Sequence, residues 1–300
     1  MSAGRESGQL PRALWLTLAG LTLAWGFNWT AIKVALSEVP PLTFRSICLG
    51  AGAAVLFLVM RLSGQRLRVP RQQWPRLMML AFFNTTCWNT LVVFGVMMIP
   101  SGRASILAFT MPAWAIPLSV WLLGERMNGR RVTGLVLGMA GMGLLLGEAA
   151  VSLRAAPVGS LLVLSAAFTW ALGTVLQRRY PMSMPAGPYS AWLMLIGGVP
   201  IFIAALVMEH PSRLLTVSLW PALGVVYNVL VAFAFATWAW TRIATSVPVA
   251  VSSLSMLMIP VVGVISGMLF LGERPSWAEY AALALVIASL LTVVVPRRVP

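Results

Sequence analysis

The chain has 300 residues, of which 59% are hydrophobic and only 9% charged, whereas average proteins carry about 25% charged residues. This composition excludes an ordinary soluble protein and is typical of an integral membrane protein. The formal net charge of +14 does not indicate nucleic-acid binding, because the basic residues stand singly or in small clusters between apolar runs. Such residues orient a chain in a membrane, so no nucleic-acid partner is expected.

Ten stretches are long and apolar enough to cross a bilayer as helices, since about 20 residues rising 1.5 Å each span the hydrocarbon core. The predicted spans are Ala13–Leu36, Leu42–Met60, Leu77–Ile99, Ala104–Leu123, Val132–Gly147, Pro157–Gln177, Pro188–Met208, Trp220–Thr241, Pro248–Leu271 and Trp277–Val295. The first span is too long for a cleavable leader, so we expect it to be retained. The fold class predicted is therefore an all-α membrane protein.

Basic residues are shared unevenly between the two ends of these spans. Fifteen lie on the side of the N-terminus: Arg5, Arg12, Arg61, Arg66, Arg68, Arg71, Arg76, Arg126, Arg130, Arg131, Arg178, Arg179, Arg242, Arg297 and Arg298. Five lie on the other side: Lys33, Arg103, Arg154, Arg213 and Arg274. Because positively charged loops resist translocation, both termini are predicted to be cytoplasmic.

Arg45 belongs to neither group, because it lies one turn inside the second predicted span. Its long stem can snorkel outward to the interface, which is the interpretation we favour. The alternative is that Arg45 faces a cavity and binds a substrate carboxylate.

The two halves of the chain repeat each other. The matching segments are Leu123-Gly124-Glu125-Arg126 with Leu271-Gly272-Glu273-Arg274, Pro112 with Pro260, Trp74-Pro75 with Trp220-Pro221, and Trp25 with Trp170. Their offsets are 148, 148, 146 and 145 residues, so residues 1–150 and 151–300 are predicted to be two five-helix repeats. Five is an odd number, so the second repeat enters from the opposite side. Inverted repeats around a central cavity are typical of secondary transporters.

Further short motifs accompany the repeat. They are Trp25-Gly26-Phe27-Asn28 with Lys33, Pro112 followed by Gly124-Glu125-Arg126, Gly134 and Gly138, and Trp170-Ala171-Leu172-Gly173 with Arg178. Together they resemble the drug/metabolite transporter (DMT) superfamily, more narrowly its EamA-type ten-helix exporters, and the chain is similar to YddG-type aromatic amino-acid exporters. The second half departs from the pattern at Ala282 and Val286, which replace the glycines. The resemblance implies a basket of ten helices that moves small metabolites outward.

Tryptophan and polar residues at membrane depth indicate where a cavity lies. Tryptophan normally sits at membrane interfaces, and an indole N–H in mid-span needs a partner or water. The residues predicted to line the cavity are Trp25, Asn28, Asn84, Trp88, Trp114, Trp170, Tyr227, Trp238 and Ser252, from spans one, three, four, six, eight and nine. For a single tryptophan the alternative is packing against a neighbouring helix, and for a serine it is close helix packing.

Pro112 and Pro260 each lie inside a predicted span, where a proline ring removes a helix hydrogen bond and bends the axis. We interpret them as hinges that open and close the two sides, with kinks that play no part in gating as the alternative.

The sequence contains few residues of the kinds that catalyse reactions or bind metal ions. All seven acidic residues are Glu, His210 is the lone histidine, and Cys48 and Cys87 both fall in apolar stretches. A membrane enzyme would need a nucleophile with a base, or a metal cluster. We therefore expect no catalytic residue, no metal site and no cofactor.

The function predicted is secondary-type export of amino acids, chiefly aromatic and other apolar ones, and related small metabolites by alternating access. No Glu or His falls near the centre of a span, so obligatory proton coupling is not expected. The alternatives are export of other metabolites or cationic drugs, with proton coupling, and a channel. Expected partners are the substrate and the bilayer, with a monomer as the working unit. The 20 Arg to one Lys favour a GC-rich bacterium and its cytoplasmic (inner) membrane.

Overall fold

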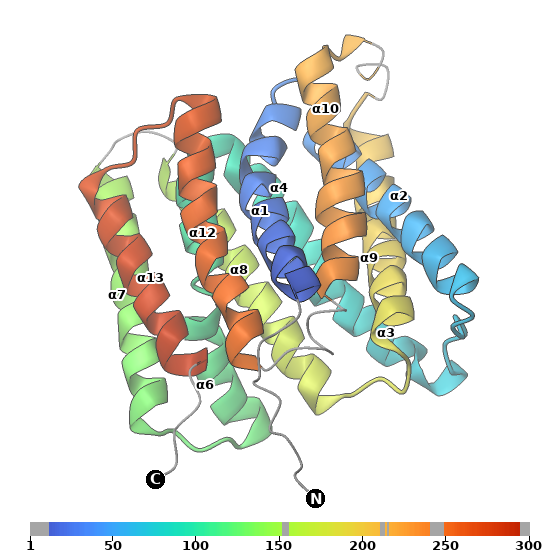
Figure 1. The fold of residues 1–300 in the computed structure, drawn as a ribbon, viewed down its shortest axis with the longest axis horizontal. Helices are drawn as coiled ribbons and strands as arrows, with labels where there is room; N and C mark the ends of the chain where they lie inside the picture. Colours follow the sequence, from blue (N-terminus) through green and yellow to red (C-terminus); the bar gives the residue numbers. More distant parts are fainter. Residues whose placement is uncertain (1–11, 152–155, 211–213, 215, 241–248, 295–300) are drawn as a thin grey trace, which may run out of the picture.

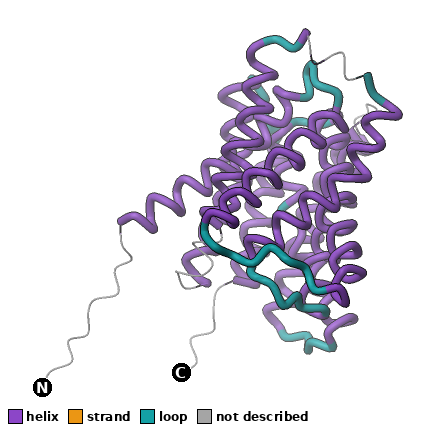
Figure 2. The backbone as a smooth tube through the Cα atoms, turned by 90° about the vertical axis from the view of Figure 1, so that its right-hand side faces the viewer, coloured by secondary structure: helices purple, strands orange, loops and turns teal. Residues whose placement is uncertain are grey.

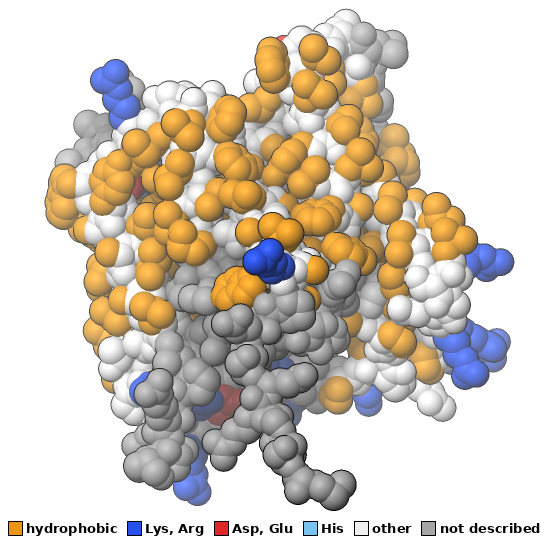
Figure 3. Space-filling model, in the orientation of Figure 1, with side chains coloured by type: hydrophobic (Ala, Val, Ile, Leu, Met, Phe, Trp, Pro, Cys, Tyr) orange, Lys and Arg blue, Asp and Glu red, His pale blue; other side chains and the backbone are white. Residues whose placement is uncertain are grey.

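A computed structural model describes residues 12–151, 156–210, 214, 216–240 and 249–294. Within these residues every regular element is helical (Figures 1 and 2). Backbone groups find no water in hydrocarbon, so a chain this apolar is stable as helices, which pair their own N–H and C=O groups. On the face shown in Figure 3, apolar side chains cover much of the described surface, and Lys and Arg lie at its edges and at one place near its middle. Leu16, Val207 and Leu269, for example, are each more than two thirds exposed.

The described chain folds into the following elements. In order they are α1 (Arg12–Ala35), α2 (Pro41–Leu62), η1 (Arg71–Gln73), α3 (Trp74–Ala81), η2 (Phe82–Cys87), α4 (Trp88–Met98), α5 (Ser101–Ala108), α6 (Met111–Leu123), α7 (Gly129–Val151), α8 (Ala156–Arg179), α9 (Ala186–Met208), α10 (Leu219–Tyr227), η4 (Asn228–Phe235), α12 (Val249–Leu271) and α13 (Trp277–Val294). Residues 236–240 continue η4 as helix.

Six helical segments of the described chain are long and apolar enough to cross a membrane. They are Pro41–Leu62, Arg71–Met98, Ser101–Leu123, Pro157–Arg179, Ala186–Met208 and Leu219–Trp240. Met258–Leu271 and Trp277–Thr292 are shorter apolar helices. These findings agree with a helical membrane protein, and the count of ten spans stays a prediction. The predicted ends at Thr241, Pro248 and Val295 lie outside the described residues.

Helix packing follows the repeat in the sequence. α1 packs against α12 and against the span formed by α10 and η4, and α8 packs against α6 and against the span formed by η2 and α4. α2 packs against α9, and α7 packs against α13, so each of these pairs joins one helix from either half. In Figure 1, α7 and α13 form one edge of the bundle, while α2 and α9 lie toward the other. Exchanging the two halves thus reproduces the main contacts.

The contact between α7 and α13 is close, although Ala282 and Val286 stand where the first repeat has glycine. Both side chains are at most 1% exposed, and the Ser289 hydroxyl donates to the Gly134 carbonyl at 2.6 Å. A Cβ atom at Gly141 would lie 3.4 Å from the Ala282 carbonyl oxygen. The glycines of α7 therefore leave enough room for the larger residues of α13.

The repeated Leu-Gly-Glu-Arg motif ends a helix in each half. Gly124 and Gly272 have φ values of +67° and +65°, which glycine adopts without steric cost. The following N–H groups turn back onto the helix, from Glu125 to the Ser119 carbonyl at 3.4 Å and from Glu273 to Gly267 at 3.1 Å. This is the usual glycine-terminated helix end, and it places a glutamate just beyond each helix.

The fourth span is interrupted where Pro112 was expected to kink it. α5 ends at Ala108 and α6 begins at Met111, so the interruption precedes the proline. Pro112 lies in the first turn of α6, where its missing N–H costs no helix bond. Pro112 thus lies within the helical span Ser101–Leu123, directly after its interruption, whereas Pro260 lies inside α12. The gating role of both prolines stays a prediction.

Two π-helical segments occupy equivalent places in the halves. η2 begins at Phe82 and η4 at Asn228, an offset of 146 residues that matches the repeat of the Trp-Pro pairs before them. Both continue into α-helix at either end. A π turn is wider than an α turn and frequently marks a functional site.

Candidate functional site

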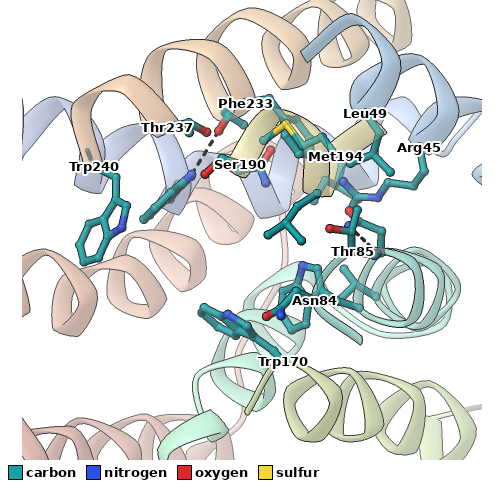
Figure 4. A pocket seen from close by; sticks show the side chains of 18 of the residues that line it. Arg45, Leu49, Asn84, Thr85, Trp170, Ser190, Met194, Phe233, Thr237 and Trp240 are labelled. Atoms are coloured by element: carbon teal, nitrogen blue, oxygen red, sulfur yellow. Dashed lines mark hydrogen bonds between the residues drawn. The ribbon is translucent and has the colours of Figure 1, made fainter. Parts of the chain in front are cut away.

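A cavity of about 510 Å³ lies between helices of both halves (Figure 4). Its size falls in the range of small-molecule sites. The lining residues are Trp25, Asn28, Trp29 and Ile32 of α1, Arg45 and Leu49 of α2, Asn84 and Thr85 of η2, Trp88, Asn89 and Val92 of α4, Phe109, Met111 of α6, Trp170 and Thr174 of α8, Ser190, Leu193 and Met194 of α9, Ala232 and Phe233 of η4, Thr237, Trp240, and Ile259 of α12.

Aromatic rings from both halves form much of the wall. The ring centroids of Trp88 and Trp170 are 4.9 Å apart, and Phe109 meets Trp170 edge to face at 6.3 Å. Trp25 lies 5.9 Å from Trp240 and donates its indole N–H to the Ala232 carbonyl at 3.2 Å. The Trp25 N–H is thereby satisfied at membrane depth. These rings offer faces and edges to an apolar or aromatic ligand.

Neutral polar groups reach the cavity from η2, α4 and α1. The side-chain amides of Asn84 and Asn89 donate to helix carbonyls, at 3.2 Å to Leu80 and at 2.8 Å to Thr85. Their amide N–H groups are thus partly used by the helix itself. Asn28 Oδ1 is buried and accepts no hydrogen bond. Buried polar atoms normally have a partner, so Asn28 is suited to receive a donor from a ligand.

Arg45 points into the cavity from α2 (Figure 4). It is only 3% exposed, so the snorkelling that we favoured from sequence is wrong. Its guanidinium carbon lies 5.1 Å from the centre of the Phe44 ring, and its Nε atom is buried without a hydrogen-bond partner. The two ion pairs recorded in the described residues are Arg103–Glu279 and Arg131–Glu125, and neither involves Arg45.

Access to the cavity decreases along its length. We call the side on which α1 begins and α13 ends the terminal side (Figure 1). Along α1, Trp25 is partly exposed, whereas Ile32 is 2% exposed. Along α4, which runs the same way, Trp88 is partly exposed and Val92 is 1% exposed. Along these two helices the lining is therefore more exposed toward the terminal side than toward the opposite side.

Carboxylates tie the two halves together on that opposite side. Glu273 accepts the N–H groups of Ser101 and Gly102 at 2.6 and 3.0 Å, at the start of α5. Glu209 accepts the N–H groups of Leu42 and Thr43 at 2.8 and 2.7 Å, at the start of α2. An anion at a helix N-terminus satisfies free donors and complements the helix dipole. In both cases a carboxylate of the second half caps a helix of the first.

Further contacts join the same end. Glu38 accepts the N–H and hydroxyl of Ser218 at 2.6 and 2.7 Å, and these hydrogen bonds hold the pKa of Glu38 below its ordinary value. Lys33 donates to the Val96 and Ile99 carbonyls at 2.7 Å, beside the end of α4. Arg103 and Glu279 form an ion pair at 2.6 Å. Polar contacts thus gather at the end opposite the termini, and two of these, Glu38–Ser218 and Arg103–Glu279, join the halves.

Glu125, the repeat counterpart of Glu273, has a different partner. It forms an ion pair with Arg131 of its own half at 2.6 Å, and the two side chains are 29% and 31% exposed. The glutamate of the repeated motif thus has two different roles. As Glu273 it joins the two halves on the opposite side, and as Glu125 it pairs within the first half on the terminal side.

The family model described as the EamA-like transporter family matches residues 12–147 and 157–295, once in each half. The chain belongs to the EamA-like transporter family. It is thus a multi-pass membrane transporter, as the DMT resemblance implied, and its family and relatives are described as transporters rather than as enzymes. Within the described residues no group of three His, Cys, Asp or Glu could hold a metal ion.

Curated relatives match this EamA-like chain over most of its length. It is 27% identical to the "Uncharacterized transporter YoaV" of Bacillus subtilis, covering 86% of this chain and 89% of that protein. It is 27% identical to a "Probable amino-acid metabolite efflux pump" of Escherichia coli, with 90% and 91% covered. The "Uncharacterized inner membrane transporter YedA" of Escherichia coli is 26% identical, with 92% and 89% covered. A solved crystal structure shares the fold, with a TM-score of 0.66, 21% identity and 95% and 97% coverage.

Five residues predicted to line the cavity of this EamA-like transporter do so in the structure. They are Trp25, Asn28, Asn84, Trp88 and Trp170. Their contact with substrate stays a prediction.

Other predicted residues lie elsewhere. Trp114 packs edge to face on Phe168 at 5.5 Å, and the Tyr227 hydroxyl donates to the Ala24 carbonyl at 2.9 Å. Trp238 is 41% exposed beside Phe235. None of Trp114, Tyr227 and Trp238 belongs to the described lining. The side chain of Ser252 lies outside the described residues.

The second and seventh spans also contribute to the lining, although neither was among the spans expected to surround the cavity. Arg45, for which the cavity was the alternative to snorkelling, and Leu49 come from α2, and Ser190, Leu193 and Met194 come from α9. Ser190 stands 145 residues after Arg45, the offset already seen between Trp25 and Trp170. Extending that offset to Arg45 pairs these two lining positions in the two repeats.

Proposed function

We propose that this transporter exports amino acids with aromatic and other apolar side chains, together with related small metabolites, from the bacterial cytoplasm. The observation that carries the proposal is the cavity of about 510 Å³, in which the Trp88–Trp170 pair lies beside neutral hydrogen-bonding groups and one buried arginine. A space of this size accommodates an aromatic amino acid with some water. Two similar proteins are named probable amino-acid metabolite efflux pumps, which supports the same class of substrate.

The proposed mechanism is alternating access between ten spans arranged as two inverted five-helix repeats. The equivalent packing of the halves supports this arrangement, because inverted repeats can exchange conformations to open either side. In the structure the contacts between halves close the side opposite the termini, and the cavity is accessible from the terminal side. With both termini in the cytoplasm, this is the conformation that loads substrate for export.

Export is expected to follow the substrate gradient. Proton exchange generally uses an ionisable acid or histidine at mid-depth. The described lining contains no Asp, Glu or His. Apart from Arg45, the polar side chains of the lining are neutral, and a neutral hydrogen bond is worth about 0.5–1.5 kcal/mol. These groups add little affinity, so the range of side chains should be broad, which suits an exporter that meets substrate at high internal concentration.

Counterflow in proteoliposomes tests the proposal. Vesicles loaded with Phe, Trp, Leu or Thr, or with sugars or organic cations, are assayed for uptake of labelled substrate. Trp88→Ala and Trp170→Ala should lower aromatic transport about tenfold, more than transport of Thr, because each removes a ring from the wall at a cost of roughly 1–2 kcal/mol. The control is Trp277→Ala, since that side chain is 74% exposed on the surface. Transport of sugars or cations with refusal of every amino acid would defeat the proposal.

A further inference from the structure

Arg45 introduces a positive charge into the cavity that the described residues leave without an anion. The side chain is 3% exposed, and its Nε atom has no hydrogen-bond partner. No carboxylate belongs to the described lining. Glu209, which follows α9, contacts the start of α2, but its oxygens already accept hydrogen bonds from the Leu42 and Thr43 N–H groups and the Thr43 hydroxyl. The described lining therefore contains one strong set of donors and no acidic acceptor.

An unpaired buried arginine is energetically costly, and at membrane depth such a residue usually has a functional partner. The guanidinium is a planar fork whose N–H groups match the two oxygens of a carboxylate. It cannot lose its charge at physiological pH, so a bound anion is the natural means of neutralising it. An organic cation in the same space would meet repulsion from Arg45.

The rest of the wall defines the remainder of the ligand. Trp88 and Trp170 provide rings for an apolar or aromatic body, and Figure 4 shows Trp170 and Asn84 across the cavity from Arg45. Asn28 Oδ1, buried without a partner, is a neutral acceptor for an amino group. A neutral acceptor stabilises an ammonium group much less than a carboxylate would. Recognition of the carboxylate should therefore dominate over recognition of the amino group.

The position of Arg45 along the cavity indicates the direction in which a bound carboxylate is drawn. Arg45 lies four residues after the start of α2, about 6 Å along the helix from the closed end. The more exposed lining lies toward the terminal side. A carboxylate attracted to Arg45 is thus drawn from the accessible side to the end through which exported substrate must leave.

We propose that Arg45 is the carboxylate-binding residue of the cavity and makes the transporter selective for organic monocarboxylates with an apolar body. This inference rests on the proposed function, because it defines the substrate class of the same site. The amino group is secondary, so 3-phenylpropanoate should be carried along with phenylalanine. Phenylalaninamide and phenethylamine, which lack the carboxylate, should be poor substrates.

Counterflow with these four compounds tests the inference on the native protein. We expect phenylalanine and 3-phenylpropanoate to be carried within about threefold of each other, and the two compounds without a carboxylate at least tenfold more slowly. This series needs no mutation, so it decides the matter even where a variant fails to fold. Equal transport of phenylalanine and phenylalaninamide would overturn the inference and leave the proposed function standing. Refusal of all four with refusal of every amino acid would instead overturn the proposed function.

Variants then assign the selectivity to one residue. Arg45→Gln should lower phenylalanine transport about 10- to 100-fold, toward the rate of phenylalaninamide, since a charge-assisted pair is lost. Arg45→Lys keeps the charge and should recover part of the preference. Arg66→Gln, in the exposed connector after α2, is the matched control and should change nothing. A carboxylate preference that survives intact in folded Arg45→Gln would show that another group binds the carboxylate.

Discussion

Replacing Glu273 with glutamine is expected to loosen the closed end of the cavity. The carboxylate accepts two backbone N–H groups of α5, at 2.6 and 3.0 Å, across the boundary between the halves. Glutamine keeps one acceptor oxygen but loses the charge that complements the helix N-terminus. Losing a cap costs about 0.5–2 kcal/mol and losing a favourable charge at a helix end about 0.3–1 kcal/mol. The free energy that keeps this end closed should therefore fall by about 1–2 kcal/mol, so opening should become about 5- to 30-fold more frequent.

Cysteine labelling of purified protein measures this opening. Ser101 is fully buried at the start of α5, and its hydroxyl makes no hydrogen bond, so Ser101→Cys is a conservative reporter. The native Cys48 and Cys87 are replaced with alanine, and the rate of reaction with a hydrophilic maleimide is followed. Glu125→Gln is the internal control, because that carboxylate belongs to a partly exposed ion pair within one half. Equal labelling rates for Glu273→Gln and Glu125→Gln would refute the reasoning.

Three other predictions follow from the fold and the site. Gly197→Ala should lower the free energy of unfolding by about 1–3 kcal/mol, because the added Cβ would lie 2.8 Å from the Ala81 carbonyl oxygen. Gly50→Ala is the control, since its Cβ would meet no atom within 4 Å, and equal melting temperatures of the two variants would contradict the prediction. Reporter fusions at Pro300 and Ala155 should report opposite sides of the membrane, and a shared side would mean a wrong span count. Counterflow should persist after the pH difference is collapsed, and stoichiometric proton movement would show that transport is coupled.

The helices could be predicted well from the sequence, because every apolar run must pair its own backbone in hydrocarbon. The helices begin and end within a few residues of most predicted limits. The fourth span is interrupted just before Met111 and not at Pro112 itself. A proline marks a break in a helix, but it also fits the first turn of the helix that follows. The π segments had no recognisable signal, because Phe82–Cys87 reads as ordinary apolar helix.

The candidate site could be predicted only in part, because periodicity shows which residues share a face but not which neighbour that face meets. Trp88 and Trp170 were placed at the cavity by their depth alone. Trp114 has the same depth and packs on Phe168 instead. Arg45 illustrates the reverse error: one turn from a helix end, an arginine can reach either water or the interior. The choice depends on how α2 is turned against α9, which a single sequence does not contain.

The π segments bear on which changes in chain length the site can absorb. η2 and η4 are each followed directly by helix that carries lining residues, including Trp88, Asn89 and Thr237. A wide π turn holds about one residue more than the α-helix it replaces, so a segment that loses one residue can tighten into an α-helix while the later side chains keep nearly their direction. A regular α-helix has no such extra residue, and a deletion there turns every later side chain by about 100°. Deleting Phe82 should therefore leave Trp88 and Asn89 at the cavity wall, whereas deleting Thr90 in α4 should turn Val92 away from it and abolish transport.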